Sequence, residues 1–68
     1  MTDSERRFID TSIKSYKTRM REAKARVLKA VDEDMFATAA MFAAEAEGYK
    51  WAINELEFQL DAADTFRE

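Results

Sequence analysis

The chain has 68 residues with no cysteine, no histidine and no proline, and its formal net charge is −3. A single core of this size supplies only about 3–5 kcal/mol unless disulfides, a metal or oligomerisation add to it. Disulfides and the usual nitrogen and sulfur ligands of zinc are excluded, so association with another chain is the expected source of further burial. A histidine or cysteine nucleophile or base is excluded as well. The sequence therefore predicts a non-enzymatic protein without cofactor or metal.

No segment has the pattern of a secretory signal or of a membrane span. The N-terminus is polar, and no apolar stretch with a small-residue cleavage site follows it. The longest apolar run, residues 35–44 with Thr38 inside it, is about half as long as a membrane-spanning helix. The absence of cysteine is consistent with a reducing compartment. These features predict a soluble, cytoplasmic protein that has no contact with membranes.

The first predicted helix covers about residues 3–31. Thr2 and Glu5 have the spacing of a capping box, in which each side chain bonds to the other residue's backbone amide. Farther along, apolar residues recur alternately four and three positions apart, which is the pattern of a coiled-coil seam. This first seam consists of Ile9, Ile13, Tyr16, Met20, Ala23, Val27 and Ala30.

An acidic turn is predicted at about residues 32–34. Val31-Asp32-Glu33-Asp34 is the only internal cluster of residues that favour a helix start, and Asp32 or Asp34 is the expected N-cap of the next helix. Because no glycine or proline enforces a break there, a single unbroken helix in a longer coiled coil is the alternative.

The second predicted helix covers about residues 34–66 and repeats the four-three spacing. At 1.5 Å per residue, each helix is about 45 Å long. The chain, 1–68, is therefore expected to be one all-α domain, an antiparallel hairpin of two long amphipathic helices that self-associates into a helical bundle. The second seam consists of Met35, Ala39, Phe42, Ala46, Tyr49, Ile53, Leu56, Leu60 and Ala63.

This plan, two helices joined by an acidic turn in a short chain, resembles that of the plasmid-encoded RNA-binding protein family of Rop. The resemblance implies a dimer that forms a four-helix bundle. It rests on architecture and covers no residue motif, so it implies no functional residues for this chain.

A second apolar stripe lies on nearly the opposite side of the second helix. A hairpin partner covers only one side of a helix, so this outer stripe predicts a self-association or partner-binding face. A glycine inside a helix costs about 0.5–1 kcal/mol, which makes close approach of a neighbour the expected reason for Gly48. The alternative interpretation is scattered apolar residues on a small surface. The outer stripe consists of Ala37, Met41, Ala44, Gly48, Trp51, Phe58 and Ala62, with Glu55 its only charged member.

Charge divides between the two helices. Residues 1–31 carry nine basic and four acidic side chains, whereas residues 32–68 carry two and ten. One interpretation is that these charges flank the two seams and select their pairing. The flanking residues would then be Lys17, Arg19, Lys24 and Arg26 on the first helix and Glu45, Glu57 and Asp64 on the second. The other interpretation is a nucleic-acid-binding surface on the first helix, made of Arg7, Lys14, Lys17, Arg21 and Lys24. The net negative charge of the chain and the absence of a known recognition motif weigh against this interpretation.

The sequence therefore predicts an oligomeric interaction protein, such as an adaptor, an assembly factor or an inhibitor of another protein. Small acidic helical proteins of this kind are frequent in phages and mobile elements. A small nucleic-acid-binding regulator that uses the basic side of the first helix is the alternative function.

Overall fold

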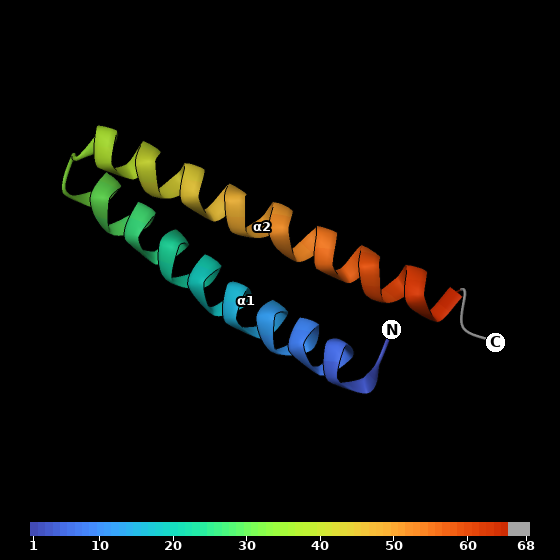
Figure 1. The fold of residues 1–68 in the computed structure, drawn as a ribbon. Coiled ribbons are helices and arrows are strands. Elements are labelled where there is room, and N and C mark those ends of the chain that lie inside the picture. The colour runs from blue at the N-terminus through green and yellow to red at the C-terminus, as the bar shows by residue number, and fades with distance from the viewer. Residues whose placement is uncertain (66–68) are drawn as a thin grey trace.

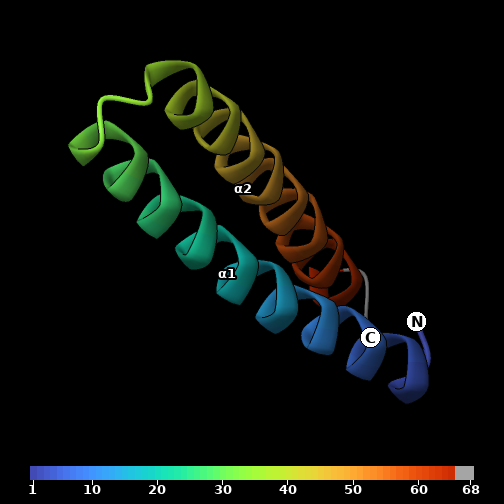
Figure 2. The same cartoon turned by 90° about the vertical axis from the view of Figure 1, so that its left-hand side faces the viewer.

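The computed structural model describes residues 1–65 and contains two antiparallel helices, α1 (Asp3–Asp32) and α2 (Phe36–Thr65) (Figure 1). The predicted all-α hairpin is confirmed, and the alternative of one unbroken helix is wrong. The two helices lie side by side, and the beginning of α1 and the end of α2 meet at the end of the hairpin opposite the turn (Figure 2). Residue 66, the predicted end of the second helix, lies outside the described residues.

The hairpin is elongated because, within residues 1–65, each of the two helices packs only against the other. The Cα atoms extend over 54 × 16 × 11 Å, with a radius of gyration of 15.6 Å. A compact domain of the same length has a radius of gyration of about 11 Å. A single layer of two helices can bury one side of each helix and leaves the other sides to solvent or to another chain.

The predicted capping box at the start of α1 is confirmed. The Thr2 amide donates to Glu5 Oε1 at 3.2 Å, and the Glu5 amide donates to Thr2 Oγ1 at 3.1 Å. These bonds satisfy two of the amides that a helix start leaves unpaired. Hydrogen bonding from Thr2 to the Glu5 carboxylate lowers the pKa of Glu5 below its ordinary value.

The turn at residues 33–35 is held by hydrogen bonds to backbone carbonyls in the last turn of α1. The Met35 amide donates to the Ala30 carbonyl at 2.8 Å and the Asp34 amide donates to the Val31 carbonyl at 3.0 Å, the two bonds of a Schellman motif. Asp34 has φ of 60°, a left-handed conformation that aspartate tolerates better than most residues.

The prediction that Asp32 or Asp34 caps the second helix is wrong. Asp32 is the last residue of α1, and Met35 is the residue directly before α2. Aspartate is favourable both at an N-cap and in the left-handed position that ends a helix, and the sequence pattern did not separate these two uses.

The seam between the helices forms the core. Ile9, Ile13 and Ile53 make a buried cluster, with Tyr16, Met20, Leu56 and Leu60 packed against it. Toward the turn the buried positions are all alanine, namely Ala23, Ala30, Ala39 and Ala46. Every predicted member of the first seam is buried or half-buried, and the same holds for the second seam except Met35, which lies in the turn and is exposed.

The two seam tyrosines contact each other across the interface. The ring centroids of Tyr16 and Tyr49 are 5.9 Å apart with an interplanar angle of 30°. The Tyr49 hydroxyl donates to Glu45 Oε1 at 3.3 Å. Both rings therefore contribute apolar surface to the seam, while the hydroxyl of Tyr49 reaches its polar edge.

Candidate interaction surface

The outer stripe of α2 is uncovered in the hairpin. Trp51 and Phe58 each expose 68% of their surface, and Met41 exposes 60%. Ala44 and Gly48 are exposed between them, whereas Ala62 is half-buried. The structure thus places the large members of the predicted stripe together on the side of α2 that faces away from α1. Ala37 and Glu55, the remaining members, are also exposed.

Helix geometry explains why these residues share one side. The outer stripe and the buried positions Ala39, Ala46 and Ile53 follow the same four-three spacing, but they are offset by about half a turn. Within residues 1–65 α2 packs against α1 alone, so only the inner set of positions is covered. Neither of the helices in residues 1–65 is long and apolar enough to span a membrane.

Gly48 lies in open space within the hairpin. A Cβ atom placed on this residue would meet no heavy atom within 4 Å outside its own helix segment. The close neighbour that the sequence led us to expect at Gly48 is therefore absent from the described hairpin.

The predicted basic side of α1 faces solvent. Arg7, Lys14, Arg21 and Lys24 are exposed, and Lys17 is half-buried. Helix periodicity places these five residues along one side of α1.

The predicted pairing of charged flanks is largely missing. Among residues 1–65 the one ion pair joins Arg6 to Asp64, at the end opposite the turn, and this contact raises the pKa of the Arg6 guanidinium. Of the seven flank residues predicted from the sequence, only Asp64 takes part in it. Arg26 instead lies over the ring of Phe42, with its guanidinium carbon 5.6 Å from the ring centroid.

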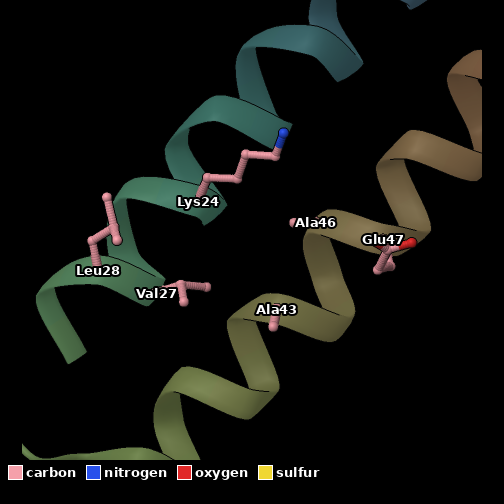
Figure 3. Close-up of a pocket in the computed structure, with 6 residues that line it drawn as sticks. All are labelled: Lys24, Val27, Leu28, Ala43, Ala46 and Glu47. Carbon is pink, nitrogen blue, oxygen red and sulfur yellow. The ribbon is translucent and has the colours of Figure 1, made fainter. Parts of the chain in front are cut away.

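A second apolar surface near the turn was missed by the sequence reasoning. Leu28 exposes 73% of its surface and Phe36 exposes 63%. Beside Leu28, a shallow groove of about 400 Å³ runs between the helices (Figure 3). A signal for it was present, because Leu28 follows Arg7, Lys14 and Arg21 at the next seven-residue step. We call this feature the turn-side groove, and it is lined by Lys24, Val27, Leu28, Ala43, Ala46 and Glu47.

Neither surface contains, among residues 1–65, a group of side chains that could hold a metal ion. Within the part of the chain that the structure describes, no three acidic side chains gather closely enough to hold a metal ion. Comparison of the chain with models of known protein families, with curated proteins and with solved structures gives no match. The two exposed apolar surfaces and the charges around them are therefore the candidate functional features of residues 1–65.

Proposed function

We propose that this protein is a non-enzymatic, oligomeric interaction protein that docks on another protein through the outer stripe of α2. It would act as an adaptor, an assembly factor or an inhibitor, and the cytoplasm is its proposed location. The observation that supports the proposal is the exposure of Trp51 and Phe58, seven residues apart, on the same side of a helix.

The composition of the stripe suits a protein partner. Tryptophan is among the residues that dominate binding energy when an interface desolvates it. Small residues beside the rings, at Ala44 and Gly48, let the backbone of a partner helix approach closely. An exposed apolar stripe on a small protein is typical of an interaction surface, because it is costly to leave in water.

Replacement of Trp51 tests the proposal. Affinity capture with the wild-type chain first identifies a partner, and titration of that purified partner then compares Trp51→Ala with wild type. We expect the substitution to weaken binding by about 30-fold or more, corresponding to roughly 2 kcal/mol. Phe58→Ala should act in the same direction, with non-additive effects if both rings contact one partner surface.

Phe8→Ala is the matched control. Phe8 is an aromatic residue on α1 that exposes 73% of its surface but lies outside the stripe. We expect partner affinity to change by less than about twofold when Phe8 is replaced, as for peripheral contacts. Equal binding by Trp51→Ala and wild type would show that the stripe is not the docking surface.

Binding of nucleic acid by the basic side of α1 is the second candidate function. It is favoured by the exposure of Arg7, Lys14, Arg21 and Lys24, none of which forms an ion pair within residues 1–65. If these residues contact phosphates, replacing Arg7, Lys14 and Arg21 by glutamine should lower the salt dependence of affinity by nearly one unit of log slope per lost contact. Titrations of the wild-type protein with RNA and DNA that show no binding would exclude this function.

A further inference from the structure

The turn-side groove lies between the helices in the part of the hairpin where the seam is built from small residues. Ala46 is buried in its floor beside Ala43, whereas isoleucines fill the seam toward the other end. In Figure 3, Val27 and Ala46 point toward the opposite helix while Lys24 and Glu47 lie on opposite sides of the groove. The hairpin thus exposes an apolar channel that its own side chains do not fill.

The two rims of the groove carry opposite charges. Lys24 is exposed on the α1 rim and Glu47 is exposed on the α2 rim. They form no ion pair with each other within residues 1–65, where the only pair is Arg6 with Asp64 at the far end of the hairpin. The apolar floor and the opposite charges of its rims together make the groove self-complementary.

We infer that the turn-side groove binds a second copy of this chain. A twofold axis parallel to the helices places α1 of one copy against α2 of the other, so that neighbouring helices remain antiparallel. Because the contact is isologous, Lys24 of each copy then faces Glu47 of the other, and this ion pair occurs twice. Leu28, which nothing in the hairpin covers, is buried against the apolar floor of the second copy.

The outer stripe is less suited to pairing with itself. Residues 32–68 carry ten acidic and two basic side chains; Glu55 is exposed within the outer stripe, and Glu47 and Asp61 are exposed next to its aromatic residues on α2. Two copies of α2 packed against each other would bring these carboxylates together, whereas packing through the groove brings α1 against α2. The inference rests on the oligomeric part of the proposed function and names its surface.

Charge reversal across the groove provides a decisive test. Sedimentation equilibrium at micromolar concentration should show a dimer for wild type. Lys24→Glu and Glu47→Lys should each give monomers, because both inter-copy pairs then join like charges. An equimolar mixture of the two variants should form a heterodimer, since both pairs again join opposite charges. Circular dichroism should show equal helix content throughout, because both side chains are exposed.

Two further variants test whether dimerisation depends on the turn-side groove and not on another part of the surface. Leu28→Gln should weaken dimerisation by about tenfold or more, because the Leu28 side chain is buried in the proposed contact between the two copies. Glu22→Lys, an exposed reversal elsewhere on α1, is the matched control and should leave the dimer intact.

Several results would overturn the inference. These are a wild-type monomer at micromolar concentration, dimers of both charge variants alone, or a mixture that forms no heterodimer. Loss of the dimer in Trp51→Ala but not in the groove variants would assign self-association to the outer stripe and would also overturn it. Failure of the docking proposal is distinguishable, because that proposal is measured by partner affinity of Trp51→Ala and not by oligomeric mass.

Discussion

The two sides of α2 have similar apolar residues and the same spacing but different surroundings. On the inner side, Ile53 is 4% exposed and packs with Ile9 and Ile13 of α1. On the outer side, Trp51 has no neighbour from α1 and remains mostly in solvent. The two residues are separated by only two positions along the chain. The comparison shows that apolar periodicity predicts which residues share a side of a helix, whereas the available partners determine which side is buried.

The charged residues also follow a regular sequence pattern that does not by itself determine which contacts form. Basic residues on α1 and acidic residues on α2 suggest cross-helix ion pairs, yet only Arg6 and Asp64 pair in residues 1–65. Exposed ion pairs contribute little to folding, so unpaired charges cost the hairpin little. Ion pairs within residues 1–65 therefore do not explain how these charges are arranged.

The largest expected difference between the two sides is in folding stability. Ile53→Ala should lower the free energy of unfolding by about 2–5 kcal/mol, because it removes buried apolar atoms from the seam. Trp51→Ala should change this free energy little, since the ring is exposed and alanine is the better helix former. Denaturant titration with circular dichroism detection measures both variants. If Trp51→Ala destabilises the protein as much as Ile53→Ala, the outer side is already covered in the free protein.

A smaller contrast is expected at two neighbouring positions of α2. Gly48→Ala should stabilise the hairpin by about 0.5–1 kcal/mol, because alanine favours helix and its Cβ would meet open space. Ala46→Gly should destabilise it by at least about 1 kcal/mol, through the helix propensity of glycine and the loss of a buried methyl group.

Thermal unfolding of the Gly48→Ala and Ala46→Gly variants provides the measurement. A destabilising effect of Gly48→Ala would mean that a neighbour contacts this glycine in solution. The same variant also reports on docking: a stable hairpin with reduced partner affinity would indicate close approach of the partner backbone at Gly48.

The smallest expected effect is at the capping box, away from both sides of α2. Because the pKa of Glu5 is lowered in the folded state, the Glu5 carboxylate stabilises the folded chain above its ordinary pKa. This contribution should be lost as pH falls through the lowered value. A pH titration of the Glu5 side chain by NMR measures the shift, and Thr2→Ala should return the pKa toward its ordinary value. An unchanged pKa in that variant would argue against the capping box as the cause.

Several features of the hairpin were predictable because they depend on local chemistry. The capping box needs only Thr2 and Glu5 at the right spacing, and the seams need only regular apolar positions along each helix. The exposure of the outer stripe also followed from geometry, because one neighbour cannot cover two sides of α2.

The turn and the turn-side groove could not be predicted from the apolar periodicity, because they depend on backbone conformation and on packing in three dimensions. The role of Asp34 depends on its left-handed backbone conformation, which aspartate adopts in a minority of its occurrences. The turn-side groove depends on how residues of both helices, such as Val27 and Ala46, are placed next to each other in three dimensions. Arg6 was not among the predicted flank residues, because its contact with Asp64 depends on the register of the two helices.

The uneven size of the seam side chains has a consequence for how the hairpin folds. Ala30 and Ala39 are nine residues apart in the chain, whereas Ile13 and Ile53 are forty apart. Closing the longer loop costs roughly 1.2 kcal/mol more, since each doubling of loop length costs about 0.6 kcal/mol. A buried isoleucine contributes about 1.5–3 kcal/mol, more than enough to offset this difference. The alanine contacts next to the turn close early but bury little surface, so the two helices should associate in a single cooperative step that depends on the distant isoleucines.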